Sequence, residues 1–142
     1  MIVLDTNVIS ALMRAVPDKV VVQWLDNQPA ESVWITSITV FEALLGLALL
    51  PRGRRRQTLE NAFDALVNED LEGRILSFDF AAANEAAGLA AARQRSGRTV
   101  DIRDTQIAGI VLARRATLAT RNLRHFADLT VPVVDPWGTT TA

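Results

Sequence analysis

The chain has 142 residues, a formal net charge of −1 at pH 7 and a hydrophobic content of 49%. A chain of this length fits one domain and buries roughly two thirds of its unfolded surface, which is enough for a hydrophobic core. Because it has no cysteine, disulfides, zinc–thiolate sites and cysteine nucleophiles are excluded. The first residues, MIVLDTN, lack the basic region of a signal peptide, so we expect a cytoplasmic protein.

The hydrophobic pattern predicts strands that alternate with helices along the chain. In chain order we expect a strand at 2–4, helices at 5–14 and 17–28, a strand at 33–36, helices at 37–50 and 51–68, a strand at 74–78, helices at 79–97 and 101–115, and strands at 116–120 and 131–135. Such alternation is typical of a mostly parallel sheet with helices on both faces. The predicted fold class is therefore α/β, a three-layer α/β/α domain over residues 1–142, frayed from about 137 onward.

Two of these helices carry a recognisable packing signal. The helix at 79–97 is rich in alanine, which allows a close approach of its backbone to a neighbour. The helix at 101–115 places Ile107, Ile110 and Val111 on one face, which we expect to be buried.

One charged residue, Glu42, stands alone in the apolar stretch from Val33 to Pro51. The stretch approaches the length of a membrane span, about 20 residues. However, it begins with the β-branched, strand-like VWIT and contains Glu42, so we expect no membrane segment. Since an unpaired buried carboxylate is very costly, Glu42 must lie at a surface rim, be protonated, or pair with a cation.

Acidic and amide side chains follow several of the predicted strands. Asp5 comes directly after the first strand, Glu42 shortly after the second, and Asn122 after the strand at 116–120. Asp101 and Asp104 open a predicted helix. Because the carboxyl ends of parallel strands share one edge of a sheet, these groups are expected to converge there.

Each acid also has a simpler interpretation as a helix cap. Asp5 can cap the first helix, Thr39 and Glu42 fit the T-x-x-E capping box, and Asp101 and Asp104 suit a helix N-terminus. Capping, however, does not require that all the acids meet at one edge. Converging carboxylates raise one another's pKa unless a cation is present, and Mg²⁺ prefers oxygen ligands. The pattern therefore predicts a magnesium site, and with arginine nearby it favours phosphodiester chemistry through a metal-activated water.

The basic residues are fourteen arginines and a single lysine, Lys19. Arginine binds phosphate in a bidentate manner, so the RGRRR cluster is a candidate phosphate-binding segment, with a solvated surface as the alternative. Its members are Arg52, Arg54, Arg55 and Arg56. His125 is the only histidine; we expect it to fix its loop, with substrate contact as the less favoured role.

Four segments together resemble the PIN-domain family, and within it the VapC-type toxins of bacterial type II toxin–antitoxin systems. They are IVLDTNVISAL, SITVFEALLG, DIRDTQIAGIVLARRATLATRNLRHF and VPVVDPW, which span almost the whole chain. The resemblance implies an α/β/α fold, endoribonuclease activity dependent on Mg²⁺ or Mn²⁺, a homodimer, and a cognate VapB-like antitoxin that blocks the acidic site.

The resemblance also implies roles for individual residues. The first, second and third acids of the family fall on Asp5, Glu42 and Asp104. Its frequent fourth acid falls on Asn122, where the neutral amide is a weaker ligand and leaves a second metal in doubt. The remaining implied groups are Asp101, as a further ligand or a group behind the ligands, and Thr6 and Thr120, as groups that orient the carboxylates or a metal-bound water.

Three other classes of protein are alternatives. A phosphoacceptor receiver domain needs a lysine after a late strand, but Lys19 lies early in the chain. A haloacid-dehalogenase-type phosphatase needs a second aspartate two residues after the first, where this chain has Asn7. A catalytically silent RNA-binding or regulatory module on the same fold remains as the alternative to an enzyme.

Overall fold

The computed structural model describes residues 1–138, which form a five-stranded parallel sheet in the order β3-β2-β1-β4-β5. The strands are β1 (Ile2–Leu4), β2 (Val33–Thr36), β3 (Ile75–Leu76), β4 (Thr117–Ala119) and β5 (Val133–Val134). The α-helices are α1 (Thr6–Leu12), α2 (Lys19–Asp26), α3 (Ser37–Ala48), α4 (Arg54–Ala65), α5 (Phe80–Arg95) and α6 (Ile102–Arg114). Short turns of other helix types are η1 (Ala30–Ser32), η2 (Leu66–Asp70) and η3 (Leu123–Phe126).

The predicted α/β class is confirmed, and the strand order explains where a site can form. The chain adds β2 and β3 on one side of β1, then crosses to place β4 and β5 on the other side. In the register, Ile2 lies beside both Val33 and Thr117, and Leu4 lies beside Ala119. The gap between β1 and β4 is therefore the point at which the strand order reverses, where open α/β sheets bind ligands at their carboxyl edge.

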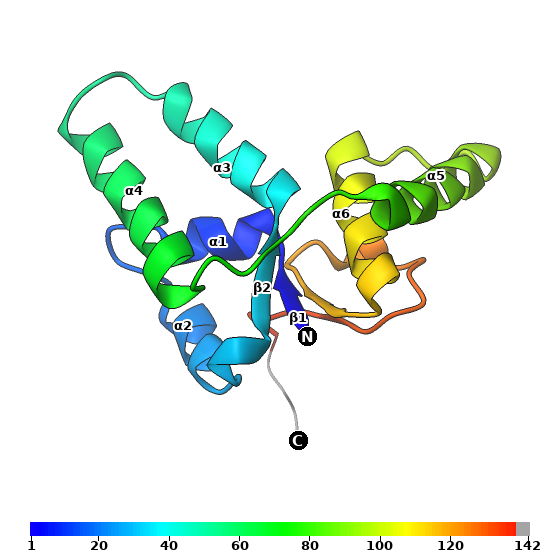
Figure 1. The fold of residues 1–142 in the computed structure, drawn as a ribbon, viewed down its shortest axis with the longest axis horizontal. Helices are drawn as coiled ribbons and strands as arrows, with labels where there is room; N and C mark the ends of the chain where they lie inside the picture. The colour runs from blue at the N-terminus through cyan, green and yellow to red at the C-terminus, as the bar shows by residue number, and fades with distance from the viewer. Residues whose placement is uncertain (139–142) are drawn as a thin grey trace.

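Each face of the sheet carries its own hydrophobic core, because neighbouring residues of a strand point to opposite faces. Leu4 and Ile35 pack with α1, α2, α3 and α4 on one face, while Val3 and Leu118 pack with α5 and α6 on the other. Figure 1 shows the first group of helices on one side of β1 and β2 and the second group on the other. The predicted inward face of α6 is correct, since Ile107, Ile110 and Val111 are all buried.

Helices α5 and α6 approach each other closely at Gly109. A β-carbon built on Gly109 would lie 2.5 Å from the carbonyl oxygen of Ala82 and 2.7 Å from the β-carbon of Ala86. The alanine-rich sequence of α5 is therefore matched by a glycine in α6, and the expected close backbone packing is observed.

Several predicted boundaries shift for local reasons. Strand β3 covers only Ile75–Leu76, because Phe78 N donates to Ser37 Oγ and the chain already turns toward α5. Helix α2 is capped by Asp18, whose carboxylate accepts from Val20 N, and so begins after Pro17. The predicted helix at 51–68 ends as an α-helix at Ala65 and continues as the single π-helical turn η2.

The end of the described chain is held against the body of the protein. Trp137 Nε1 donates to Asp18 Oδ2 at 2.9 Å, and the guanidinium of Arg121 lies 4.8 Å from the Trp137 ring centroid. The expected fraying therefore does not include Trp137, and residues 139–142 lie outside the described residues. Within residues 1–138, no helix is both long enough and apolar enough to cross a membrane.

Candidate active site

Asp5 lies at the carboxyl end of β1 and is 3% exposed. Its Oδ1 accepts from Thr6 N at 2.8 Å, so the expected role as the cap of α1 is observed. Its Oδ2 accepts from Thr120 Oγ1 at 2.8 Å, which joins the ends of β1 and β4. Burial raises the pKa of Asp5 to about 6, against the hydrogen bonds that lower it, and the charges of Asp104 and Glu42 raise it further. Asp5, Glu42 and Asp104 are thus close enough to interact electrostatically.

Glu42 lies in the second turn of α3, the helix that follows directly after β2. Its Oε1 accepts from Thr6 Oγ1 at 2.8 Å, and its Oε2 lies 3.7 Å from Arg103 Nη1. The capping-box interpretation is wrong, because Thr36 caps α3 by accepting from Thr39 N and leaves Glu42 beyond the first turn. The charge in the middle of an apolar stretch therefore faces the rim of the sheet and the residue after Asp5.

A row of three threonine hydroxyl groups, linked by short contacts, holds the side chain of Thr6 in place beside Glu42. Thr36 Oγ1 donates to Thr39 Oγ1 at 3.3 Å, and Thr39 Oγ1 lies 3.1 Å from Thr6 Oγ1. Because the single proton of Thr6 Oγ1 is donated to Glu42, Thr39 must be the donor to Thr6. Thr36 and Thr39 are fully buried, so the row fixes Thr6 through groups that water does not reach.

Asp104 lies in the first turn of α6, and its Oδ2 lies 2.8 Å from His125 Nδ1. The hydrogen bonds found within residues 1–138 engage Oδ2 and leave Oδ1 free of protein donors. His125 lies on η3, after β4, so this pair joins α6 to the loop that follows the neighbouring strand. His125 thus contacts an acid of the site, which the sequence alone did not predict.

The other predicted groups are placed differently. Asp101 caps α6 by accepting from Arg103 N at 2.8 Å and is exposed, which agrees with its simpler interpretation as a helix cap. Asn122 is exposed, and its backbone N donates to Thr120 Oγ1 at 3.0 Å. Thr6 and Thr120 each donate to a carboxylate, of Glu42 and Asp5 respectively.

The RGRRR cluster covers the end of the loop after α3 and the first turn of α4, near the end of α3 that is remote from the sheet (Figure 1). Arg56 is already engaged, since its Nε donates to Glu60 Oε1 at 2.8 Å and its Nη1 donates to Leu50 O. Arg52, Arg54 and Arg55 are exposed. These arginines are therefore not part of the acid rim.

Two residues of the site have no counterpart in the sequence argument. Asn7 Nδ2 donates to both Asp5 Oδ2 and Thr120 Oγ1, at 3.3 and 3.2 Å, and its Oδ1 accepts from Arg121 N. Arg103 lies between Glu42 and Asp101. The position of Asn7, two residues after the first acid, was the available signal, but its other partners, Thr120 and Arg121, lie 113 and 114 residues away in the chain.

The donor set fits a hard divalent cation. All three acids offer oxygen, and the raised pKa of Asp5 reports a cost that a nearby cation would relieve. Among residues 1–138, no three histidine, cysteine, aspartate or glutamate side chains are grouped closely enough to hold an ion as they stand. Magnesium commonly binds through one or two carboxylates and keeps several waters, so it does not need three direct protein ligands. Asp5, Glu42 and Asp104 would hold such an ion, directly or through water.

The arrangement of acids at the reversal of strand order is matched by a family assignment. The profile of the PIN domain matches residues 2–131, and the chain belongs to the PIN-domain family. The resemblance found in the four sequence segments is thereby confirmed.

Individual relatives carry the comparison further. The chain is 39% identical over 137 residues to VapC ribonuclease Y4jK of Sinorhizobium fredii, covering 96% of this chain and 98% of that protein. It is 36% identical over 137 residues to toxin FitB of Neisseria gonorrhoeae, covering 96% and 99% of the two chains. The solved structure of FitAB bound to an IR36 DNA fragment superposes with a TM-score of 0.87 at 36% identity, covering 97% of this chain and 96% of that one. These relatives place the chain in the VapC-type branch of the family.

Proposed function

We propose that the protein is a metal-dependent endoribonuclease that acts as the toxin of a toxin–antitoxin pair. The observation that carries the proposal is the approach of Asp5, Glu42 and Asp104 from three separate elements. Burial is the main cause of the raised pKa of Asp5, and the charges of Asp104 and Glu42 raise it further. Similarity over nearly the full chain to a VapC ribonuclease and to toxin FitB supports RNA as the substrate class and toxicity as the role.

The residues of the chain have distinct parts in this proposal. Asp5, Glu42 and Asp104 would hold Mg²⁺, with Mn²⁺ as a substitute, and Asn122 and Asp101 remain weaker candidates. Thr6 and Thr120 orient the carboxylates of Glu42 and Asp5 through their hydroxyl protons. When bound, such a cation lowers the pKa of a coordinated water and stabilises the leaving oxygen of a phosphodiester.

The proposal includes two protein partners and a cytoplasmic location. Phe41 on α3 and Leu49 at its C-terminal end have exposed fractions of 55% and 76%, and Phe80 at the start of α5 is 89% exposed. Exposed apolar side chains of this size favour an interface, and we assign it to a second copy of the chain. The names FitAB and toxin FitB of the relatives support an antitoxin partner that blocks the acidic rim.

The deciding experiment replaces Glu42 by glutamine. The change keeps the size and hydrogen-bonding capacity of the side chain and removes the charge that holds the cation. We expect Glu42→Gln to abolish Mg²⁺-dependent cleavage of RNA while circular dichroism shows an unchanged fold, and Asp5→Ala to behave alike in cleavage.

The matched control is Glu85→Gln, an exposed glutamate on α5, which should cleave RNA at the wild-type rate. Cleavage by folded Glu42→Gln at the rate of this control would contradict the site assignment. RNA binding without any cleavage by the wild type would instead favour the catalytically silent module.

A further inference from the structure

Arg93 is a charged side chain that is only 4% exposed, and it belongs to α5 rather than to the acid rim. A buried guanidinium is tolerated when its donors are paired. Its Nε and Nη2 donate to Oδ2 and Oδ1 of Asp128, both at 2.9 Å, in a two-pronged ion pair. Its Nη1 donates to Thr105 Oγ1 at 2.8 Å, and Nη2 also donates to the backbone oxygen of His125 at 2.7 Å.

These partners lie on either side of Asp104. Thr105 is the next residue along α6, and His125 is the residue whose ring contacts Asp104 Oδ2. Arg93 therefore binds the side chain of Thr105, which follows Asp104, and the backbone of His125, whose ring contacts Asp104. One guanidinium thus joins α5, α6 and the segment around η3 directly behind the Asp104–His125 pair.

The segment around η3 is held against the rest of the protein through a few residues. The 3₁₀ turn has four residues, its N-cap Asn122 makes no side-chain capping bond, and the His125 side chain is 49% exposed. Phe126 is buried and anchors one point of the turn. The second anchor is the ion pair at Asp128, to which Arg98 adds a further contact at 3.5 Å. Arg98 also donates to the backbone oxygen of Arg124, whereas Arg93 donates to the backbone oxygen of His125 itself. The hydrogen bond from Arg93 holds the pKa of Asp128 below its usual range, so the pair stays ionised at neutral pH.

We propose that Arg93 is a positioning residue of the acid rim: it fixes His125 against Asp104 and so sets the orientation of the Asp104 carboxylate. The consequence for RNA cleavage rests on the proposed function, whereas the consequence for His125 does not. The guanidinium of Arg93 binds Asp128, Thr105 and His125 at once through its planar set of N–H donors. A lysine ammonium cannot reproduce these contacts, which explains why arginine is needed.

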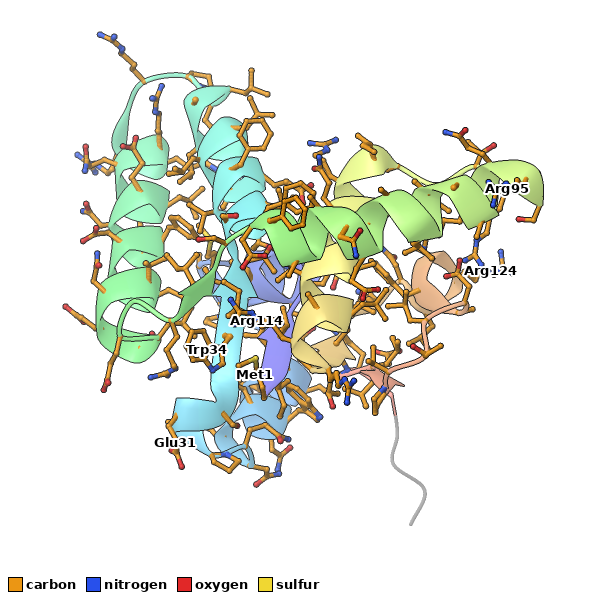
Figure 2. The ribbon with its side chains drawn as sticks, turned by 45° about the vertical axis from the view of Figure 1, so that its right-hand side comes forward. Met1, Glu31, Trp34, Arg95, Arg114 and Arg124 are labelled. Atoms are coloured by element: carbon orange, nitrogen blue, oxygen red, sulfur yellow. The ribbon has the colours of Figure 1, made fainter. Side chains whose placement is uncertain are left out.

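The test uses the fact that His125 is the only histidine of the chain, so its ring signals in an NMR spectrum need no further assignment. The variants are Arg93→Lys and Asp128→Asn. Asparagine keeps the shape of the aspartate side chain, so Asp128→Asn still provides the test if Arg93→Lys does not fold. Arg95→Lys is the control, because Arg95 is exposed at the C-terminal end of the same helix, at the end of the molecule where Arg124 lies (Figure 2). Asp104→Asn provides the reference spectrum for a His125 ring without its carboxylate partner.

In metal-free protein, we expect the His125 ring ¹H and ¹⁵N shifts of Arg93→Lys and Asp128→Asn to move from the wild-type values toward those of Asp104→Asn. Amide signals of β1 and β4 should stay in place, and Arg95→Lys should match the wild type. Wild-type ring shifts in either folded Arg93→Lys or folded Asp128→Asn would overturn the proposal.

Kinetics separate this inference from the proposed function. If the wild type cleaves RNA, Arg93→Lys should lower kcat by about ten- to a hundredfold, with KM within about twofold, because a displaced group affects the reaction more than binding. Unchanged kcat in a variant whose His125 signals have moved would overturn the positioning role. Absence of cleavage by the wild type would count against the proposed function, and the NMR comparison would still decide whether Arg93 fixes His125.

Discussion

Asp5 combines two properties that oppose each other, since it is buried where it joins β1 and β4 and, in the proposed function, has to be charged to bind a cation. Burial raises its pKa from 3.8 to about 6, and the hydrogen bonds from Thr120 and Thr6 offset only part of that rise. Because the folded-state pKa exceeds the unfolded value, the folded protein binds the proton more tightly. Its contribution to stability is therefore present below pH 4 and is lost as the pH rises through 6.

The cost of keeping Asp5 ionised in a buried position predicts that Asp5→Asn stabilises the metal-free protein. A difference of about two pKa units corresponds to about 3 kcal/mol at most, reduced by imperfect hydrogen bonding of the new amide. We expect the free energy of unfolding of metal-free Asp5→Asn at pH 7.5 to exceed that of the wild type by about 1–3 kcal/mol. Urea denaturation between pH 4 and 7.5 should also show a smaller loss of stability with rising pH.

The exposed Asp26→Asn is the matched control for this experiment and should follow the wild-type pH dependence. Equal stability of Asp5→Asn and wild type across the pH range would show that burial of Asp5 carries no cost.

At the scale of elements, the position of Asp104 depends on how closely α5 and α6 pack. Gly109→Ala would place a methyl group 2.5 Å from a backbone oxygen of α5, so the helices must separate. We expect a loss of about 1–3 kcal/mol in the free energy of unfolding, more than the gain in helix propensity returns. Chemical denaturation measures the change.

The control is Gly88→Ala within α5, where an added β-carbon meets no atom within 4 Å. This substitution should stabilise the protein by about 0.5–1 kcal/mol, because alanine is the better helix former. A Gly109→Ala protein as stable as Gly88→Ala would mean that α5 can move away without cost.

A second prediction at this scale concerns the RGRRR cluster at the start of α4. We propose that Arg52, Arg54, Arg55 and Arg56 contact RNA phosphates beyond the acid rim, with Arg56 contributing least because it is paired with Glu60. Replacing all four by glutamine should weaken RNA binding and lower the dependence of log K on log salt, by about 0.7 for each lost phosphate contact with single-stranded RNA. An unchanged salt dependence would leave the cluster as a solvated surface.

For the whole molecule, the acids are close together only in the folded chain. Mg²⁺ or Mn²⁺ should therefore bind the native state and not the unfolded one. A ligand of this kind adds about 1.4 kcal/mol at ten times its Kd, which should raise the melting temperature by a few degrees. Scanning calorimetry at neutral pH, on protein first freed of metal, measures the shift, and Asp104→Asn should lose it. A wild-type melting temperature that ignores both ions at millimolar concentration would contradict the shared-metal interpretation.

The sequence by itself determined the alternation of strands and helices, because apolar residues at strand and helix spacing can be buried in few other ways. The same reasoning brought Asp5, Glu42 and Asp104 to one edge, since parallel strands end together. The local sequence around Glu42 fits both a helix cap and a site residue, because the same Thr39 and Glu42, three residues apart, satisfy the capping-box pattern.

The resemblance named Thr6 and Thr120 as orienting groups, and only the tertiary structure decided which acid each of them contacts and that Arg93 contacts His125, the partner of Asp104. The hydrogen bonds of Thr6 to Glu42, of Thr120 to Asp5 and of Arg93 to His125 join residues 32 to 115 positions apart. Local sequence patterns carry no signal for such contacts, because they depend on strand order and helix packing rather than on neighbouring residues. Arg93 is the clearest example: nothing in the local sequence of α5 distinguishes it from the exposed Arg95, and its burial follows only from the packing of α5, α6 and the turn after β4 around it.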